Sequence, residues 1–163
     1  MADKFRCQLT VRHYECDLLG HVNHAVYLHY FEVGRLEAMA AAGLPFREVL
    51  RQGYAVVATE VRVQYKAPAF ADDVLDLVSY IVHFRGALMI WQQELYRASS
   101  GELLALAEVH GAFTRASGRP TRIPPAMRAC LEAVYVPEAA WPARGEALRG
   151  KPPQRSSPAW PVE

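Results

Sequence analysis

Residues 13–35, HYECDLLGHVNHAVYLHYFEVGR, decide the fold that this sequence predicts. An acid, Asp17, stands in a short loop ahead of a long apolar segment that begins at Asn23 or His24 and ends at Gly43. A helix that is apolar all round is normally buried. Free N–H groups and the positive end of the helix dipole lie at its start, where an anion or an oxyanion is stabilised. We therefore expect a buried helix whose first turn faces the Asp17 carboxylate.

Strand patterns account for most of the remaining chain. Residues 4–12 alternate strictly between apolar and polar side chains, which is typical of a half-buried strand. Four further strands are predicted at residues 57–66, 73–84, 87–97 and 102–115. Short helices are predicted at residues 45–52 and 124–135. Tight turns between successive strands imply antiparallel pairing. The chain is therefore expected to be an α+β protein with a curved five-stranded antiparallel sheet wrapped around one long central helix.

The composition excludes several classes of protein. The chain has 163 residues, a formal net charge of +1 and both signs of charge interspersed, which argues against nucleic-acid binding. No segment reaches the roughly 18 apolar residues of a membrane span. The three cysteines predict no disulfide framework, and the first residues lack the apolar core of a signal peptide. We therefore predict a cytoplasmic protein.

Two parts of the chain differ in composition. Residues 1–136 carry the helix and strand patterns, whereas residues 137–163 hold six of the eleven prolines. We expect a single domain followed by a Pro-rich, largely extended tail, in which Trp141 and Trp160 could anchor the tail on the domain or on a partner. One helix leaves apolar surface and a sheet edge uncovered, so we also expect a homodimer or a homotetramer.

The loop and the helix start match the pattern of a known family. The matching positions are Asp17, Gly20, Val22, Asn23-His24 and Tyr27, followed by Phe31-Glu32 and Arg35. The segment VQYKAPAFADDV, residues 63–74, resembles the second signature of the same family, a Tyr followed by a Pro and an Asp. Over roughly residues 4–135 the chain resembles the hotdog-fold acyl thioesterases. It is most similar to the 4-hydroxybenzoyl-CoA thioesterase-like group, which includes acyl-CoA and acyl-carrier-protein thioesterases.

The resemblance implies roles for the residues at the helix start. Asp17 is implied as the catalytic carboxylate, acting either as a nucleophile or as a general base. The backbone amide of His24 is implied as the donor that polarises the thioester carbonyl. Asn23 is expected to cap the helix, or to hold the attacking water. The run HVNH is similar to the HVNN of plant acyl-ACP thioesterases, but Leu19 replaces the Asn of their catalytic set. His21 is therefore expected only as a helper.

Further residues are candidates for contact with the substrate. Tyr27 and Phe31 lie one helical turn apart; they are core residues by default, and either is a candidate to border the acyl pocket. Lys66 is a candidate to meet the phosphates of CoA or of the carrier protein's pantetheine arm, and its alternative is a solvated charge. Glu32 and Arg35 are expected to pair at or near an interface.

Other functions compete with a thioesterase. Four histidines near Asp17 suggest a metal site, but their spacing matches no zinc signature, so neither a metal nor an organic cofactor is expected. The first alternative is a non-catalytic module that binds acyl thioesters, and the second is a hotdog hydratase or dehydratase. The predicted function is hydrolysis of an acyl-CoA or acyl-carrier-protein thioester to free acid and thiol. Replacing Asp17 by Asn discriminates among the three.

Overall fold

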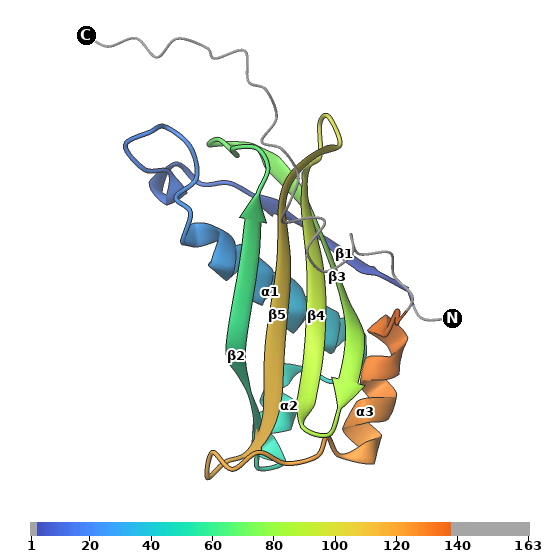
Figure 1. The fold of residues 1–163 in the computed structure, drawn as a ribbon. Helices are drawn as coiled ribbons and strands as arrows, with labels where there is room; N and C mark the ends of the chain where they lie inside the picture. The colour runs from blue at the N-terminus through green and yellow to red at the C-terminus, as the bar shows by residue number, and fades with distance from the viewer. Residues whose placement is uncertain (1–2, 138–163) are drawn as a thin grey trace, which may run out of the picture.

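The computed structural model describes residues 3–137 of the chain (Figure 1). The predicted Pro-rich tail, with Trp141 and Trp160, therefore lies outside the described residues, apart from residue 137. The strands are β1 (Phe5–Thr10), β2 (Tyr54–Tyr65), β3 (Val74–Arg85), β4 (Leu88–Arg97) and β5 (Glu102–Arg115). The helices are α1 (Val26–Ala41), α2 (Phe46–Arg51) and α3 (Pro125–Leu131), with short 3-10 turns at His13–Glu15 and Glu132–Val134.

The five strands form one antiparallel sheet in the order β1-β3-β4-β5-β2. Figure 1 shows this sheet curving around α1, with α2 near the start of β2 and α3 beside the end of β3. The architecture is the hotdog fold, and the predicted α+β class and strand positions are confirmed. β2 forms one edge of the sheet, and its last residue, Tyr65, contacts Tyr27 of α1 and the turn before that helix.

Helix α1 is shorter and less buried than the sequence predicts. It begins at Val26 rather than at Asn23 or His24, because residues 23–25 form a separate turn. One side of α1 packs on the sheet and carries the buried residues, among them Phe31 and Ala38. Leu28 and Leu36 on another side are 43% and 38% exposed. The prediction of a helix buried all round is thus wrong for residues 3–137, in which part of the apolar surface of α1 is not covered.

The contact between α1 and the sheet depends on a glycine and a buried amide. A Cβ atom at Gly34 would lie 2.4 Å from Leu77 Cδ2, so the helix approaches β3 too closely for any side chain there. The buried Gln93 donates from Nε2 to the Phe31 carbonyl and accepts at Oε1 from Arg35 Nη1, at 2.8 Å and 2.9 Å. Burial lowers the pKa of Arg35. Arg35 is therefore bound to the sheet, and the nearby Glu32 acts on it through its charge, which opposes the lowering of the Arg35 pKa.

Strand β2 contains a bulge that the sequence pattern does not predict. The pairing with β5 shifts by one residue between Ala58 and Glu60. Side chains alternate between the two faces of a strand, so one extra residue reverses the alternation beyond it. As a result Ala58 and Val61 face the same side of the sheet, although their spacing in the sequence assigns them to opposite sides.

Candidate active site

The loop that carries Asp17 is a tight turn between Cys16 and Val22, which form an isolated β-bridge. The Asp17 amide donates to the His21 carbonyl at 3.0 Å, and the Leu19 amide donates to Asp17 Oδ1 at 2.8 Å. The half-buried carboxylate thus has one oxygen held by its own loop. Asp17 serves as a turn residue, and it also lines a cavity.

The turn before α1 uses nearly all of its backbone amides. The Asn23 amide donates to the Glu15 carbonyl, and the Ala25 amide donates to Asn23 Oδ1 at 2.9 Å. The Val26 amide donates to the Asn23 carbonyl. Within residues 3–137, the amide of His24 is left without an acceptor. The Asn23 side chain therefore acts as a cap, while His24 keeps a donor for a ligand.

A cavity of about 340 Å³ is lined both by the loop that carries Asp17 and by the turn that carries His24. Asp17, His21 and His24 line it from the loop and the turn, and Tyr27 lines it from α1. Lys66 lines it from the segment after β2, and in the described part of the chain its ammonium group forms no ion pair. The structure therefore brings together an acid, a free backbone donor and a cation around one space.

Tyr65 is a member of the site to which the sequence analysis assigned no role. Its hydroxyl donates to the His24 carbonyl at 2.7 Å, and its ring packs edge-on against the ring of Tyr27, with the ring centroids 5.1 Å apart. Burial raises the pKa of both Tyr27 and Tyr65. Both side chains are therefore neutral donors or acceptors at neutral pH. The signal was present in the sequence, since Tyr65 is the tyrosine of the segment VQYKAPAFADDV.

Ala69 connects the loop after β2 to both other parts of the site. Its carbonyl accepts from the Val22 amide at 2.8 Å, and its amide donates to the Tyr27 hydroxyl at 3.2 Å. Since Ala69 is fully buried, these bonds are shielded from water. The backbone of Ala69 therefore links the Asp17 loop to α1.

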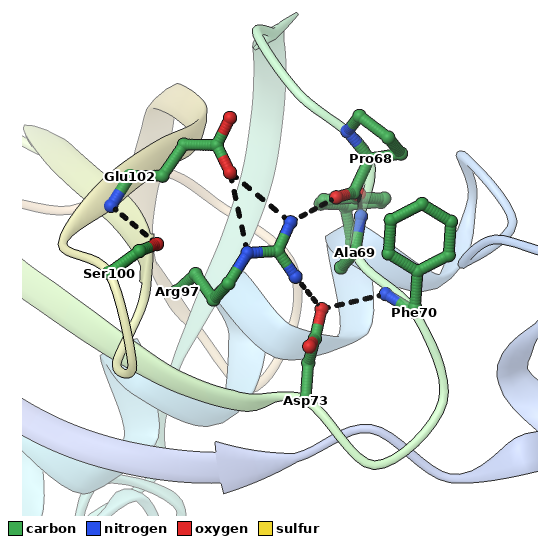
Figure 2. A network of polar contacts seen from close by, with 8 residues as sticks. Pro68, Ala69, Phe70, Asp73, Arg97, Ser100 and Glu102 are labelled. Carbon is green, nitrogen blue, oxygen red and sulfur yellow. Dashed lines mark hydrogen bonds and ion pairs between the residues drawn. The ribbon is translucent and has the colours of Figure 1, made fainter. Parts of the chain in front are cut away.

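Arg97, at the end of β4, holds the loop that contains Ala69 (Figure 2). Its guanidinium donates to Asp73 Oδ2 and to the Pro68 carbonyl, the latter at 2.8 Å. A weaker contact of 3.3 Å joins it to Glu102. Asp73 in turn accepts from the Phe70 amide at 2.9 Å. Sequence analysis missed Arg97, because nothing local distinguishes it from any charged residue at the end of a strand.

Phe31 does not join the site. It is fully buried in the core between α1 and the sheet and does not line the cavity. The prediction that it contacts the substrate is therefore not supported, and the core role applies. Across the described range 3–137, no three His, Cys, Asp or Glu side chains gather as a metal site, and no helix is long and apolar enough to cross a membrane.

Comparison with known proteins points to one family. A family model described as "Thioesterase-like superfamily" matches residues 11–131. The chain is 28% identical over 128 residues to the Arabidopsis thaliana acyl-acyl carrier protein thioesterase ATL3, covering 78% of this chain and 67% of that protein. It is 30% identical over 105 residues to the acyl-CoA thioester hydrolase YbgC of Escherichia coli O6:H1, covering 64% and 78%.

A solved structure has the same fold over most of the chain. A hypothetical protein from Thermus thermophilus, TT1821, superposes with a TM-score of 0.75 at 25% identity, covering 80% of this chain and 98% of that one. The family model matches residues 11–131, which include the Asp17 loop, α1 and all the residues that line the cavity.

Proposed function

This chain belongs to the thioesterase-like superfamily, and on that premise we propose that it hydrolyses an acyl-CoA or acyl-carrier-protein thioester to a free acid and a thiol. Its relatives are named as an acyl-acyl carrier protein thioesterase and an acyl-CoA thioester hydrolase, which supports this reaction. The single observation that carries the proposal is that Asp17 and His24 line the same cavity, and that the His24 amide has no acceptor within residues 3–137.

The thioester carbonyl is proposed to accept a hydrogen bond from the His24 amide. Negative charge grows on this oxygen in the transition state, and one backbone donor of this kind is worth about 3 kcal/mol of barrier. In the general-base route, Asp17 takes a proton from water, the hydroxide attacks the acyl carbon, and the C–S bond breaks. In the nucleophilic route, Asp17 attacks the acyl carbon, the C–S bond breaks to release the thiolate, and water then hydrolyses the resulting anhydride. In both routes the released thiolate takes up a proton to become the free thiol.

The thiol half of the substrate is proposed to lie over Lys66 and His21. Both side chains line the cavity on the side of the loop after β2 and the Asp17 turn. CoA and the pantetheine arm of a carrier protein both carry phosphate, which a lysine ammonium attracts as a point charge. This arrangement does not distinguish the two carriers, so both belong to the proposal.

A second copy of the chain is proposed to complete the site. Leu28 and Leu36 on α1 are exposed, as are Val61 and Tyr65 on β2, by 38–49%. β2 is also an edge strand with free backbone groups along one side. Pairing of two β2 edges in a homodimer, or in a dimer of dimers, would cover both the exposed apolar side chains and the edge of the sheet. Sedimentation equilibrium tests this, and a monomer at micromolar concentration would contradict it.

Replacing Asp17 by Asn tests the catalytic proposal. The Asn Oδ1 still accepts from the Leu19 amide, so the turn is retained, while the base and the nucleophile are lost. Thiol release from acyl-CoA should fall by about 10²–10⁴-fold, with binding preserved. The matched control is Asp72→Asn, an exposed loop acid outside the cavity, which should leave the rate unchanged.

Two other results would replace the proposal. Binding of acyl-CoA without thiol release by the wild-type protein would indicate a non-catalytic module, and product formation without free thiol would indicate a hydratase. Under single-turnover conditions in H₂¹⁸O, label in the Asp17 carboxylate would establish the anhydride route, because direct attack by water on the thioester places label only in the product acid.

A further inference from the structure

A second cavity, of about 260 Å³, lies further along the same helix. Its wall contains eight apolar side chains, from Leu36, Met39, Phe46, Val56, Ala58, Met89, Trp91 and Val109. The backbone of Gly111 contributes a further part of the wall, where a Cβ atom would come 3.2 Å from Val56 Cγ1. The cavity is thus a largely apolar space between α1, α2 and the sheet.

One side of α1 runs from the Asp17 cavity to this second cavity. His24 lines the first, and Glu32 and Leu36 line the second. Leu28 stands four residues after His24 and four before Glu32, which puts it between the two cavities on the same side of the helix. Leu28 is 43% exposed. The helix therefore offers an apolar path between the cavities that is open in the single chain.

One face of β2 runs between the same two cavities. Tyr65 lines the first cavity, and Ala58 and Val56 line the second. The bulge after Ala58 keeps Val61 on the face shared by all of them, and Val61 is 42% exposed. The bulge thus gives β2 an apolar face that runs between the two cavities.

We propose that the second cavity is the chamber for the far end of the substrate's acyl chain, and that this chain reaches it along the seam between Leu28 and Val61. The inference rests on the proposed thioesterase function. Twelve residues separate His24 from Leu36, which is about 18 Å of helix. With C–C bonds of about 1.5 Å, an extended alkyl chain advances roughly 1.25 Å per carbon, so the path holds about 14 carbons. The substrates are accordingly linear acyl thioesters of about 12 to 16 carbons.

The charged side chains at the second cavity are compatible with an alkyl chain. Arg35 lines the cavity, but its Nη1 atom is bound to the buried Gln93 Oε1. Glu32 is exposed and stands at the rim. The eight apolar side chains therefore make the cavity suitable for an alkyl chain. A second copy of the chain packed over Leu28 and Val61 would exclude water from the path.

Replacing Ala58 by Phe tests the inference, because the new ring enters the second cavity from an exposed position on an edge strand. The rate of thiol release, as kcat/KM, is measured for saturated acyl-CoA substrates from 4 to 18 carbons. The wild-type value should peak at about 12 to 16 carbons. In Ala58→Phe the value for the 14-carbon substrate should fall at least tenfold, with the 4-carbon value within about twofold.

The matched control is Val57→Phe, which adds the same kind of ring on the opposite face of the same strand. Its chain-length profile should equal that of the wild type. An unchanged profile in Ala58→Phe, an equal loss at all lengths, or the same shift in Val57→Phe would overturn the chamber while leaving the thioesterase proposal intact.

Calorimetric binding separates the inference from the proposed function. If the wild-type protein hydrolyses no acyl-CoA, the thioesterase proposal fails, and binding of tetradecanoyl-CoA and butyryl-CoA is then compared. Weaker binding of tetradecanoyl-CoA alone in Ala58→Phe would still support the chamber, and equal binding by the variant and the wild type would overturn it.

Discussion

The hydroxyl of Tyr65 donates a hydrogen bond of 2.7 Å to the carbonyl oxygen of His24, joining β2 to the turn before α1. The same peptide unit is held at its other end, because the Ala25 amide donates to Asn23 Oδ1. With both ends of this peptide fixed, the preceding peptide, which carries the His24 amide, is also oriented. Tyr65 is therefore a positioning residue for the proposed oxyanion donor.

Replacing Tyr65 by Phe should lower kcat about fivefold with little change in KM. The variant removes one hydrogen bond worth about 1 kcal/mol, and it acts on a donor that matters most in the transition state. Since Tyr65 is 49% exposed, the melting temperature should change little. Thiol-release kinetics and thermal unfolding are the measurements. Tyr14→Phe, at a position 69% exposed and outside the cavity, is the control. An equal loss of kcat in Tyr65→Phe and Tyr14→Phe would show that Tyr65 does not position the His24 amide.

Replacing Arg97 by Met should destabilise the protein by about 3 kcal/mol and also reduce activity. The guanidinium side chain is 15% exposed and binds Asp73, the Pro68 carbonyl and Glu102, so its loss leaves a largely buried carboxylate at Asp73 unpaired. The loop that holds Ala69 would then loosen, and with it the Asp17 turn. Urea unfolding and thiol release measure the two effects.

Arg97→Lys should restore little of either quantity, because a single ammonium group does not reproduce the planar fork of a guanidinium. Arg115→Met, at the exposed end of β5, is the matched control and should behave like the wild type. Full stability in Arg97→Lys would show that charge alone, rather than the fork geometry, holds the loop.

Local patterns were sufficient to predict most of the fold. Residues 102–115 form a strand with the predicted bounds, and the end of α1 lies within two residues of Gly43. The resemblance to hotdog thioesterases is also confirmed. These features depend on side-chain periodicity and on turn residues, which are properties of neighbouring positions.

The features that were missed depend on contacts between distant positions. The bulge after Ala58 appears only when β2 is paired with β5. The contacts of Arg97 with Pro68 and Asp73 span 24 or more residues. The later start of α1 follows from Asn23, whose side chain binds the Ala25 amide and continues the turn. The location of Asp17 and the His24 amide at one cavity agrees with the prediction, whereas their catalytic roles stay a proposal.

Replacing Gly34 by Ala should destabilise the protein by about 2–3 kcal/mol. The intrinsic helix preference of Ala favours the substitution by about 1 kcal/mol, but the new methyl group would stand 2.4 Å from Leu77 Cδ2 and 2.7 Å from Ser79 Oγ. The steric cost is the larger of the two effects. Chemical unfolding measures the difference. Val33→Ala, on the exposed side of the same helix, is the control and should be neutral or slightly stabilising. A more stable Gly34→Ala would mean that α1 moves away from β3 at little cost.

Glu94 makes stability depend on pH through a cluster at β1, β3 and β4. Burial alone would raise the pKa of Glu94, but hydrogen bonds from Lys4, Tyr96 and Tyr80 outweigh burial and lower it. Because the carboxyl pKa is lower in the folded state, the ionised carboxylate stabilises the protein at pH values above the unfolded pKa of about 4.3. This stabilisation is lost as the pH falls through the folded pKa. Burial and the bond to Glu94 raise the pKa of Tyr96 to about 12, so the tyrosine contribution is present below pH of about 10 and is lost as the pH rises.

Replacing Glu94 by Gln should therefore lower the melting temperature most near pH 7 and least near pH 3. At neutral pH the wild type has the ionised carboxylate as acceptor for three donors, and at low pH the carboxyl is protonated and resembles the amide. Calorimetric melting at pH 3, 5, 7 and 9 measures the difference between the two proteins. Glu37→Gln, on the exposed side of α1, should show a difference that stays small at every pH. A Glu94→Gln difference that is constant from pH 3 to 9 would assign the loss to packing instead of charge.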